Sequence, residues 1–227
     1  MGKMITVIIA AAGKGTRLNG IPKAFVKLGG RHLIYYSLDT FCHRADEVII
    51  VFPEKYVKRW DKKLKKIYKN IRIVAGGLYR QDSVRNAIDI MANRTGIVLV
   101  HDVARPFLSV GLFNRLVEAA EKYGACVPYV GLRDTLKEMK DNFVVRTLDR
   151  NIIVGVQTPQ AFKADFLRKA YAEAYRKNFY GSDDSVLVEM LGVDVYLVEG
   201  EQENIKITYP VDLKLAKIIL KQWKTVE

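Results

Sequence analysis

Glycines and basic side chains gather in one short segment near the N-terminus. Residues 11–18 read AAGKGTRL, and Pro22-Lys23 follow shortly after. Glycine lets backbone N–H groups approach a phosphate closely, and lysine and arginine supply the positive charge that attracts phosphate oxygens. The cations of this segment are Lys14, Arg17 and Lys23. Because the segment directly follows an apolar run, we interpret it as a triphosphate-binding loop at the end of a first buried strand.

Other glycine-rich phosphate-binding loops have different spacings. The G-x-x-x-x-G-K-[ST] pattern of a P-loop is absent from this segment. A dinucleotide-binding fingerprint would need a third glycine where Leu18 stands. The remaining alternative is a tight surface turn with ordinary lysines. Two glycines and three cations placed after a buried strand favour phosphate binding over that alternative.

A second loop begins with a glycine pair. Gly76 and Gly77 end an apolar run and can expose backbone groups to a base or a ribose. The segment continues as RQDSV, in which Asp82 or Ser83 would cap the next helix.

A third loop, HDVARP at residues 101–106, follows the apolar residues 97–100. Asp102, just past a buried strand, can hold Mg²⁺ or orient a hydroxyl group. Arg105 can clamp a phosphate with its fork of N–H donors. The alternative is an internal ion pair between Asp102 and Arg105. We interpret His101 as structural rather than catalytic.

Weaker signals lie in the second half of the chain. Lys206 stands in an apolar alternating run, where a buried lysine needs an anionic partner. The other polar segments are Arg133-Asp134-Thr135, Asp149-Arg150, Gln157-Thr158-Pro159-Gln160 and Glu199-Gly200. We find no convincing Ser-His-Asp or Cys-His set among these residues.

The elements that must position these loops alternate between apolar β-branched runs and amphipathic stretches. The expected strands are 5–10, 47–52, 71–75, 97–101 and 125–130. The expected helices between them are 32–43, 54–69, 82–93 and 111–123. This pattern predicts a Rossmann-like, three-layer α/β/α fold with a mainly parallel twisted sheet. Ligands of such sheets bind beyond the carboxyl ends of the strands, where all three loops lie.

The pattern changes between residues 133 and 157. Residues 135–139 and 144–148 are short and partly polar, and Lys140-Asp141-Asn142 can turn, which predicts an inserted β-hairpin. A hairpin with few apolar residues has little to bury against its own domain, so we expect it to pack on another subunit. We then expect helices at 163–177 and 184–191, strands at 195–198 and 205–208, and a helix from Pro210. Residues 1–227 are expected to form a single domain.

Composition restricts the classes to which the protein can belong. Of 227 residues, 49% are hydrophobic and 27% are charged, which is typical of a globular protein and excludes disorder as the main state. The net charge of +12 attracts nucleic acid, acidic membranes or phosphorylated small molecules. Much of the excess lies within residues 55–69 and at Lys214, Lys217, Lys221 and Lys224. We interpret both groups as solvated helix faces.

Cysteine usage and the N-terminal segment indicate the compartment. Cys42 and Cys126 stand in apolar surroundings without a CxxC motif or zinc-site spacing, so we expect reduced core thiols. The apolar run near the N-terminus is too short for a signal peptide or a membrane span. We therefore expect a cytoplasmic protein that does not bind or span a membrane.

Taken together, AAGKGTRL–PK, GG–RQDSV, HDVARP, RDTLK, DR, QTPQAF, VEG and NIKIT resemble one family closely. It is the 2-C-methyl-D-erythritol 4-phosphate cytidylyltransferases of the non-mevalonate isoprenoid pathway. The match runs in order across nearly the whole chain. AAGxGxR is shared with many sugar nucleotidyltransferases, whereas HDVARP together with QTPQAF and NIK is much more specific. The chain departs from the family pattern at Leu18, Ala24 and residues 182–186.

The resemblance implies a role for each motif. The residues around CTP would be Ala11, Ala12, Gly13, Gly15, Gly76, Arg80 and Ser83. The catalytic cations would be Arg17, Lys23, Arg150 and Lys206. The acceptor side would add Asp102, Arg105, Thr135 and Thr158, with Thr135 and Arg150 on a hairpin that in this family crosses to a partner subunit. The family is homodimeric and uses a divalent cation, normally Mg²⁺, for which Asp102 is our candidate ligand.

The expected reaction needs no protein nucleophile. An oxygen of the acceptor phosphate attacks the α-phosphorus of CTP, and pyrophosphate leaves, so catalysis consists of positioning and charge neutralisation. The nearest alternative is a ribitol 5-phosphate cytidylyltransferase, because those enzymes share much of this motif set. A basic nucleic-acid-binding protein is a remote alternative, since no recognised binding motif is evident. We expect CTP and a polyol phosphate as ligands, and no nucleic acid.

Overall fold

The central strands are apolar, β-branched runs that the sheet buries on both faces. The computed structural model describes residues 3–13, 15–18 and 20–223. The parallel strands lie in the order β5 (Ile71–Ala75), β4 (Glu47–Phe52), β1 (Met4–Ala10) and β6 (Thr95–Asp102). In β1, Val7 and Ile9 pack into one hydrophobic core and Ile8 into another, the alternation of a strand with helices on both sides.

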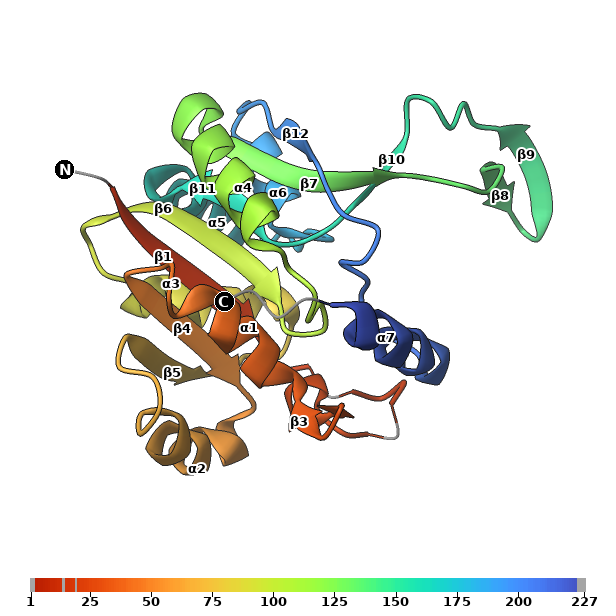
Figure 1. Ribbon diagram of the computed structural model, residues 1–227. Coiled ribbons are helices and arrows are strands. Elements are labelled where there is room, and N and C mark those ends of the chain that lie inside the picture. The colour runs from red at the N-terminus through yellow and green to blue at the C-terminus, as the bar shows by residue number, and fades with distance from the viewer. Residues whose placement is uncertain (1–2, 14, 19, 224–227) are drawn as a thin grey trace.

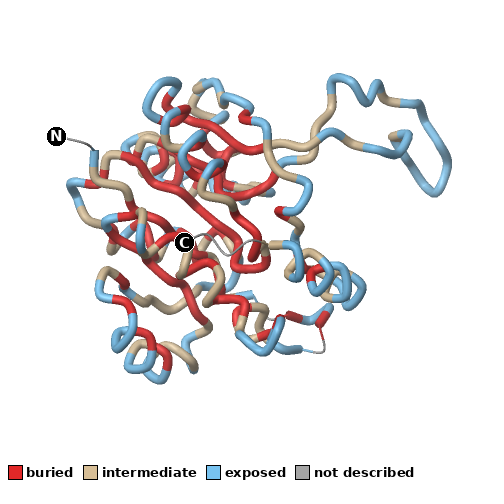
Figure 2. Tube along the Cα trace, in the orientation of Figure 1, coloured by how far each residue is buried: buried red, intermediate tan, exposed pale blue. Residues whose placement is uncertain are grey.

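Two helix layers cover this sheet. The face that carries Val7 and Ile9 packs against α1 (Leu33–Phe41), α2 (Glu54–Leu64) and α4 (Val110–Tyr123). The Ile8 face packs against α3 (Arg80–Ile90), α5 (Ala164–Arg176) and α6 (Asp184–Glu189). Figure 2 shows the buried residues concentrated along the central strands. The predicted Rossmann-like α/β fold is therefore confirmed.

The other half of the sheet is mixed. β7 (Ala125–Gly131) carries β12 (Tyr196–Glu199) parallel to it and β10 (Val154–Val156) antiparallel. β11 (Gln160–Lys163) lies antiparallel between β6 and β7. The sequence patterns did not predict β10 or β11.

The strand predicted at residues 205–208 is wrong. This segment is irregular in the structure, although its alternating pattern is real, with Ile207 buried and Lys206 exposed. Ile207 N–H donates one backbone hydrogen bond to the Ala104 carbonyl, at 2.9 Å. A strand needs a neighbouring strand to pair with, and the alternation of a single sequence does not reveal whether one is available.

A third apolar cluster joins two segments that are distant in sequence. It contains Leu28, Leu33, Phe107, Ile207 and Ala216. The first segment holds a 3₁₀ turn, η1 (Lys23–Phe25), and the short strands β2 (Lys27–Leu28) and β3 (Arg31–His32). The second ends in α7 (Pro210–Gln222), which begins at Pro210 as predicted. The cluster therefore anchors the segments that carry Lys23 and Lys206.

The inserted hairpin forms an arm, defined here as residues 133–157. β8 (Lys137–Lys140) and β9 (Phe143–Thr147) pair antiparallel, and every residue of both strands is exposed. Asp141 and Asn142 between them have φ of 49° and 67°, as a two-residue hairpin turn requires. The arm extends away from the rest of the chain (Figure 1).

The remaining sequence predictions concern the surface and the thiols. The lysines of residues 58–69 and of α7 are exposed, which confirms solvated helix faces, and Lys224 lies outside the described residues. Cys42 and Cys126 are free, and burial raises the pKa of each thiol to about 12. Within the described part of the chain, no helix combines the length and the apolar run that crossing a bilayer requires.

Candidate active site

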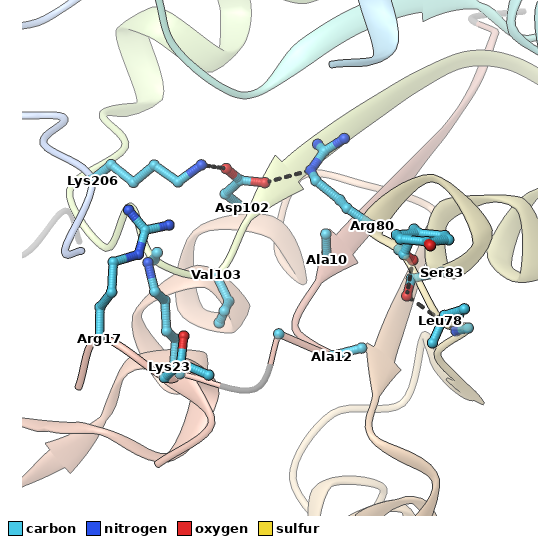
Figure 3. Close-up of a pocket in the computed structure, with 16 residues that line it drawn as sticks. Ala10, Ala12, Arg17, Lys23, Leu78, Arg80, Ser83, Asp102, Val103 and Lys206 are labelled. Carbon is cyan, nitrogen blue, oxygen red and sulfur yellow. Dashed lines mark hydrogen bonds and ion pairs between the residues drawn. The ribbon is translucent and has the colours of Figure 1, made fainter. Parts of the chain in front are cut away.

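A cavity of about 430 Å³ opens at the carboxyl ends of β1 and β6 and at the start of α3 (Figure 3). This is the position at which parallel sheets bind their ligands, and the volume is in the range of small-molecule sites. Its walls are formed by Ala10, Ala12, Gly13, Gly15, Thr16, Arg17, Lys23, Gly77, Leu78, Tyr79, Arg80, Ser83, Asp102, Val103, Ala104 and Lys206.

The glycine loop after β1 depends on glycine at one position in particular. Gly15 has φ of +64°, and a Cβ there would lie 1.8 Å from the Ile21 carbonyl oxygen. Any side chain would therefore displace the loop from the wall of the cavity. Lys14, which we predicted to add charge to this loop, lies outside the described residues.

Three cations from different elements line the same cavity. Arg17 comes from the glycine loop, Lys23 from η1, and Lys206 from the segment before α7. The Arg17 guanidinium lies 5.4 Å from the Tyr209 ring centroid, a cation–π contact that directs it from one side. Burial lowers the pKa of Lys23, and the nearby charges of Lys206 and Arg17 lower it further. These side chains repel one another until an anion lies between them.

Asp102 is the one carboxylate among the described residues that line this cavity. Its Oδ2 lies 2.6 Å from Lys206 Nζ, and its Oδ1 accepts a hydrogen bond from Arg80 Nε at 3.1 Å (Figure 3). Burial alone would raise the pKa of Asp102, but Arg80 and Lys206 outweigh it and hold this pKa well below its usual range. Asp102 is therefore an anion at any pH near neutrality.

The ion pair considered between Asp102 and Arg105 is replaced by other contacts. Arg105 Nη1 donates to the Asn204 carbonyl at 2.7 Å, whereas Asp102 contacts Arg80 and Lys206. Lys206 has the anionic partner that its position predicted, although its side chain is 45% exposed rather than buried.

At the opposite end of the cavity, the one charged side chain among the described lining residues is Arg80, which Asp102 and Asp184 neutralise. Ser83 Oγ accepts a hydrogen bond from Gly77 N–H at 3.1 Å and donates to the Tyr79 carbonyl at 3.0 Å. The N-cap position of α3 itself is held by Tyr79 rather than by Asp82 or Ser83, but the predicted cap is present, because Asp82 closes a capping box. Asp82 still serves the helix start, since it accepts the Tyr79 N–H at 2.9 Å from the third helical position.

Comparison with known proteins gives one consistent family. The family model described as 2-C-methyl-D-erythritol 4-phosphate cytidylyltransferase matches residues 5–222. A protein of that name from Clostridioides difficile is 39% identical, over 99% of this chain and 97% of its own length. Another from Aquifex aeolicus is 40% identical, over 96% of this chain and 98% of its own length.

This chain belongs to the 2-C-methyl-D-erythritol 4-phosphate cytidylyltransferase family. Solved structures agree with the assignment. The crystal structure of the cytidylyltransferase from Thermus thermophilus superposes with a TM-score of 0.83 at 39% identity, covering 96% of this chain and 99% of that one. The 4-diphosphocytidyl-2C-methyl-D-erythritol synthase from Anaerococcus prevotii superposes with a TM-score of 0.86 at 32% identity, covering 96% of each chain.

The cytidylyltransferase motifs do not all meet at one place in this chain. The predicted site residues that line the cavity are Ala12, Gly13, Gly15, Arg17, Lys23, Arg80, Ser83, Asp102 and Lys206. Gly76 lines a smaller adjoining cavity that shares Ala12 and Gly77 with the first.

Three predicted residues lie behind the cavity wall rather than on it. Ala11 N–H donates to the Val51 carbonyl, and Arg105 contacts Asn204 as described. Thr158 Oγ1 accepts the backbone N–H of Asp102 at 3.0 Å, so it supports the segment that carries this carboxylate.

Two predicted residues, Thr135 and Arg150, lie on the arm and outside the cavity of their own chain. Arg150 Nη1 donates to the Arg133 carbonyl at 3.0 Å within the arm.

Gly77, which the sequence singled out together with Gly76, lines the cavity. The cavity also includes residues that the sequence did not single out as site residues: Ala10, Thr16, Leu78, Tyr79, Val103 and Ala104. Their position at or after the carboxyl end of β1, β5 or β6 was an available signal, since residues at strand ends face the ligand site of a parallel sheet. Their types gave no further indication, because small and apolar residues are common in loops.

Proposed function

We propose that this protein transfers the cytidylyl group of CTP to 2-C-methyl-D-erythritol 4-phosphate and releases pyrophosphate. The observation that carries the proposal is the convergence of Arg17, Lys23 and Lys206 on one cavity at the carboxyl end of the sheet. Such an excess of positive charge matches a triphosphate that must be bound beside an acceptor phosphate. Membership of the cytidylyltransferase family supports CTP and the methylerythritol phosphate as the two substrates.

The reaction forms one bond and breaks another at the same phosphorus. An oxygen of the acceptor phosphate attacks the α-phosphorus of CTP, and the bond from that phosphorus to the pyrophosphate oxygen breaks. A phosphate monoester is already ionised near neutral pH, so no protein base has to remove a proton. Arg17 and Lys23 neutralise the charge that develops on the phosphate oxygens, which lowers the barrier.

The two ends of the cavity suit the two ends of CTP. In the glycine loop, Ala12, Gly13 and Gly15 offer backbone groups to the phosphates, and Ala11 anchors the start of this loop to the Val51 carbonyl. The end at Ser83, with Gly76 in the adjoining cavity, receives the cytosine and the ribose. The guanidinium of Arg80 is held by Asp102 and Asp184, so in this proposal it serves the acceptor side rather than the base. A neutral pyrimidine needs no cation beside it. A phosphate bound at this end would lie away from Arg17 and Lys23 and would lose its ion pairs with them.

The acceptor lies on the Lys206 side in this proposal. Lys206 and Asp102 bind its phosphate and hydroxyl groups, and Thr158 and Arg105 hold the loops that carry them. Thr135 and Arg150 reach the site from the arm of a second copy, so the active form is a homodimer. The apolar side chains exposed on the arm support this, with Phe143 77% exposed and Val144 63% exposed.

The residues present fit a Mg²⁺ ion that is held mainly by phosphates. Within the described ranges, no group of three or more Asp, Glu, His or Cys side chains could enclose a metal. Mg²⁺ is usually bound by one or two carboxylates together with substrate phosphates, and Asp102 offers one such carboxylate. Held by Asp102 and the substrate phosphates, Mg²⁺ would withdraw negative charge from the phosphate oxygens.

A pyrophosphate-release assay tests the proposal. The protein is supplied with Mg²⁺, with CTP, ATP, GTP or UTP, and with 2-C-methyl-D-erythritol 4-phosphate or ribitol 5-phosphate. We expect rapid release only with CTP and the methylerythritol phosphate. Preference for ribitol 5-phosphate would reassign the acceptor, and equal rates with all four nucleotides would contradict the proposed base site.

A further inference from the structure

A buried carboxylate lies directly behind the cavity wall. Asp184 begins α6, is 0% exposed, and does not line the cavity. Its Oδ2 accepts a hydrogen bond from Arg80 Nη2 at 2.8 Å, and its Oδ1 accepts the Tyr171 hydroxyl at 2.6 Å. Its backbone N–H donates to Gln160 Oε1 at 3.1 Å. Each oxygen of this carboxylate thus has a partner of its own.

Arg80 connects this carboxylate to the active site. Its Nη2 contacts Asp184 and its Nε contacts Asp102, at 2.8 Å and 3.1 Å. Since the guanidinium is planar and rigid, fixing one edge of it fixes the direction of the other. Burial disfavours the charge on Arg80, but the two carboxylates outweigh it and raise its pKa well above the ordinary value.

The contacts continue to the acceptor side. Asp102 uses its second oxygen for Lys206 Nζ, at 2.6 Å. Asp184, Arg80, Asp102 and Lys206 thus form a row of alternating charges from the buried end of α6 to the cavity. Without the Asp184 charge, Arg80 would keep one carboxylate partner, Asp102, and would compete there with Lys206. Packing alone does not require a charge at residue 184, because burying a carboxylate costs free energy that a neutral side chain avoids.

We propose that Asp184 is a positioning residue for the reaction: by holding the far edge of Arg80, it sets the position of Asp102 and, through it, of Lys206. This inference rests on the proposed function, in which Asp102 and Lys206 face the acceptor. The triphosphate side of the cavity, at Arg17 and Lys23, is not part of the row. Loss of Asp184 therefore affects the acceptor more than CTP.

The test is Asp184→Asn, which keeps the size and removes the charge. We expect kcat/KM for the acceptor to fall by about tenfold or more, the size of a lost hydrogen bond to a charged group. The KM for CTP should stay within about threefold of the wild-type value. The matched control is Tyr171→Phe, which removes the hydrogen bond to the other oxygen of Asp184 and leaves the Arg80 contact intact. It should lower the melting temperature without changing acceptor kinetics.

The kinetic outcomes separate this inference from the proposed function. A wild-type protein that releases no pyrophosphate with any substrate pair contradicts the function. An active wild type with unchanged acceptor kinetics in Asp184→Asn contradicts the inference, as does an equal acceptor loss in Tyr171→Phe. If Asp184→Asn does not fold, Arg80→Lys takes its place, because one ammonium group cannot bridge both carboxylates in the geometry of Arg80. Unchanged acceptor kinetics in that variant would also overturn the inference.

Crystal structures of the wild type and Asp184→Asn test the same point without turnover. The inference expects the Lys206 Nζ–Asp102 contact to lengthen or the Arg80 side chain to turn. If Arg80, Asp102 and Lys206 occupy the same positions in the two structures, the inference is contradicted.

Discussion

At the scale of single residues, the dominant property of the site is unbalanced positive charge. The described residues that line the cavity include Arg17, Lys23, Arg80 and Lys206, against one carboxylate, Asp102. Arg80 and Lys206 both contact Asp102, so Arg17 and Lys23 are, among these described residues, the cations that face the cavity without an acidic partner there. Burial, and then repulsion from Lys206 and Arg17, lowers the pKa of Lys23, and a bound triphosphate would relieve that repulsion.

Removing either cation should therefore slow the chemistry. We expect Arg17→Ala and Lys23→Ala each to lose turnover by ~10²-fold or more, the usual effect of deleting a donor that stabilises transition-state charge. Turnover is measured as the steady-state rate of pyrophosphate release with saturating substrates. Lys27→Ala is the matched control, because Lys27 is an exposed lysine on β2 outside the cavity. Near-normal turnover in both test variants would contradict the roles given to Arg17 and Lys23.

At the scale of elements, a buried histidine ties the end of β6 to the chain that enters β11. His101 Nε2 lies 3.0 Å from the Arg105 carbonyl, and Nδ1 lies 3.3 Å from Thr158 Oγ1. Its ring also contacts Phe41 of α1, with centroids 5.0 Å apart. These contacts hold the loop that presents Asp102, which agrees with the structural role predicted for His101.

The burial of this histidine makes stability depend on pH. Burial lowers the pKa of His101 from about 6.5 to about 4, so the folded protein keeps the ring neutral. Below pH 6.5 the unfolded chain binds a proton that the folded chain does not, and the free energy of unfolding decreases until pH reaches about 4. We expect His101 to contribute a loss of about 3 kcal/mol over this interval.

Chemical unfolding measured at several pH values between about 4 and 7 checks this expectation. His101→Gln keeps a polar side chain that does not titrate, and all other titrating groups are shared with the wild type. The variant should be less stable near neutral pH and should lose less stability on acidification. Parallel pH profiles for the two proteins would show that His101 is not the group responsible.

At the scale of the whole molecule, the predicted site residues of one chain are divided between its body and its arm. The cavity is built from the main α/β body, whereas Thr135 and Arg150 lie on an arm that extends away from it (Figure 1). The arm exposes Met139, Phe143 and Ile152, which are 69%, 77% and 82% exposed. Apolar side chains in such number on a two-stranded hairpin are typical of a surface that another subunit covers.

Subunit mixing tests whether two copies share each site. Arg150→Ala and Lys206→Ala should both be nearly inactive alone. If the arm of one subunit completes the cavity of the other, a mixed dimer contains one site with both residues intact. Random reassortment of equal amounts should then restore about a quarter of wild-type activity, since half the dimers are mixed and each has one working site.

The control for this experiment is a mixture of Lys206→Ala with Lys23→Ala, because Lys206 and Lys23 of one subunit line the same cavity. Each site in that mixed dimer carries one of the two changes, so activity should not recover. Recovery in the control, or none in the Arg150→Ala mixture, would contradict a site shared through the arm.

Much of this protein could be predicted from local patterns. The parallel strands β1, β4, β5 and β6 and their helices follow from apolar periodicity, because a strand or helix must place its apolar residues on the side that is buried. The arm hairpin followed from its turn residues, and Asp141 and Asn142 have the positive φ that this turn needs. The glycine loop was recognisable because the φ of +64° at Gly15 is one that glycine adopts far more readily than other residues, so the residue type itself marks the turn.

Only the tertiary structure decided which distant segments of the chain pair with one another. β10 and β11 are too short to be recognised before their partners β7 and β6 are known, and the alternating residues 205–208 have no partner strand among the residues that the structure describes. The contact of Arg80 with Asp184 joins residues that are 104 positions apart, and the contact of Lys206 with Asp102 joins residues at the same separation. A sequence specifies which charges exist and which local conformations are allowed. Which carboxylate meets which cation depends on the packing of the helices and strands that carry them, because the Coulomb energy of a pair is set by its distance and its burial.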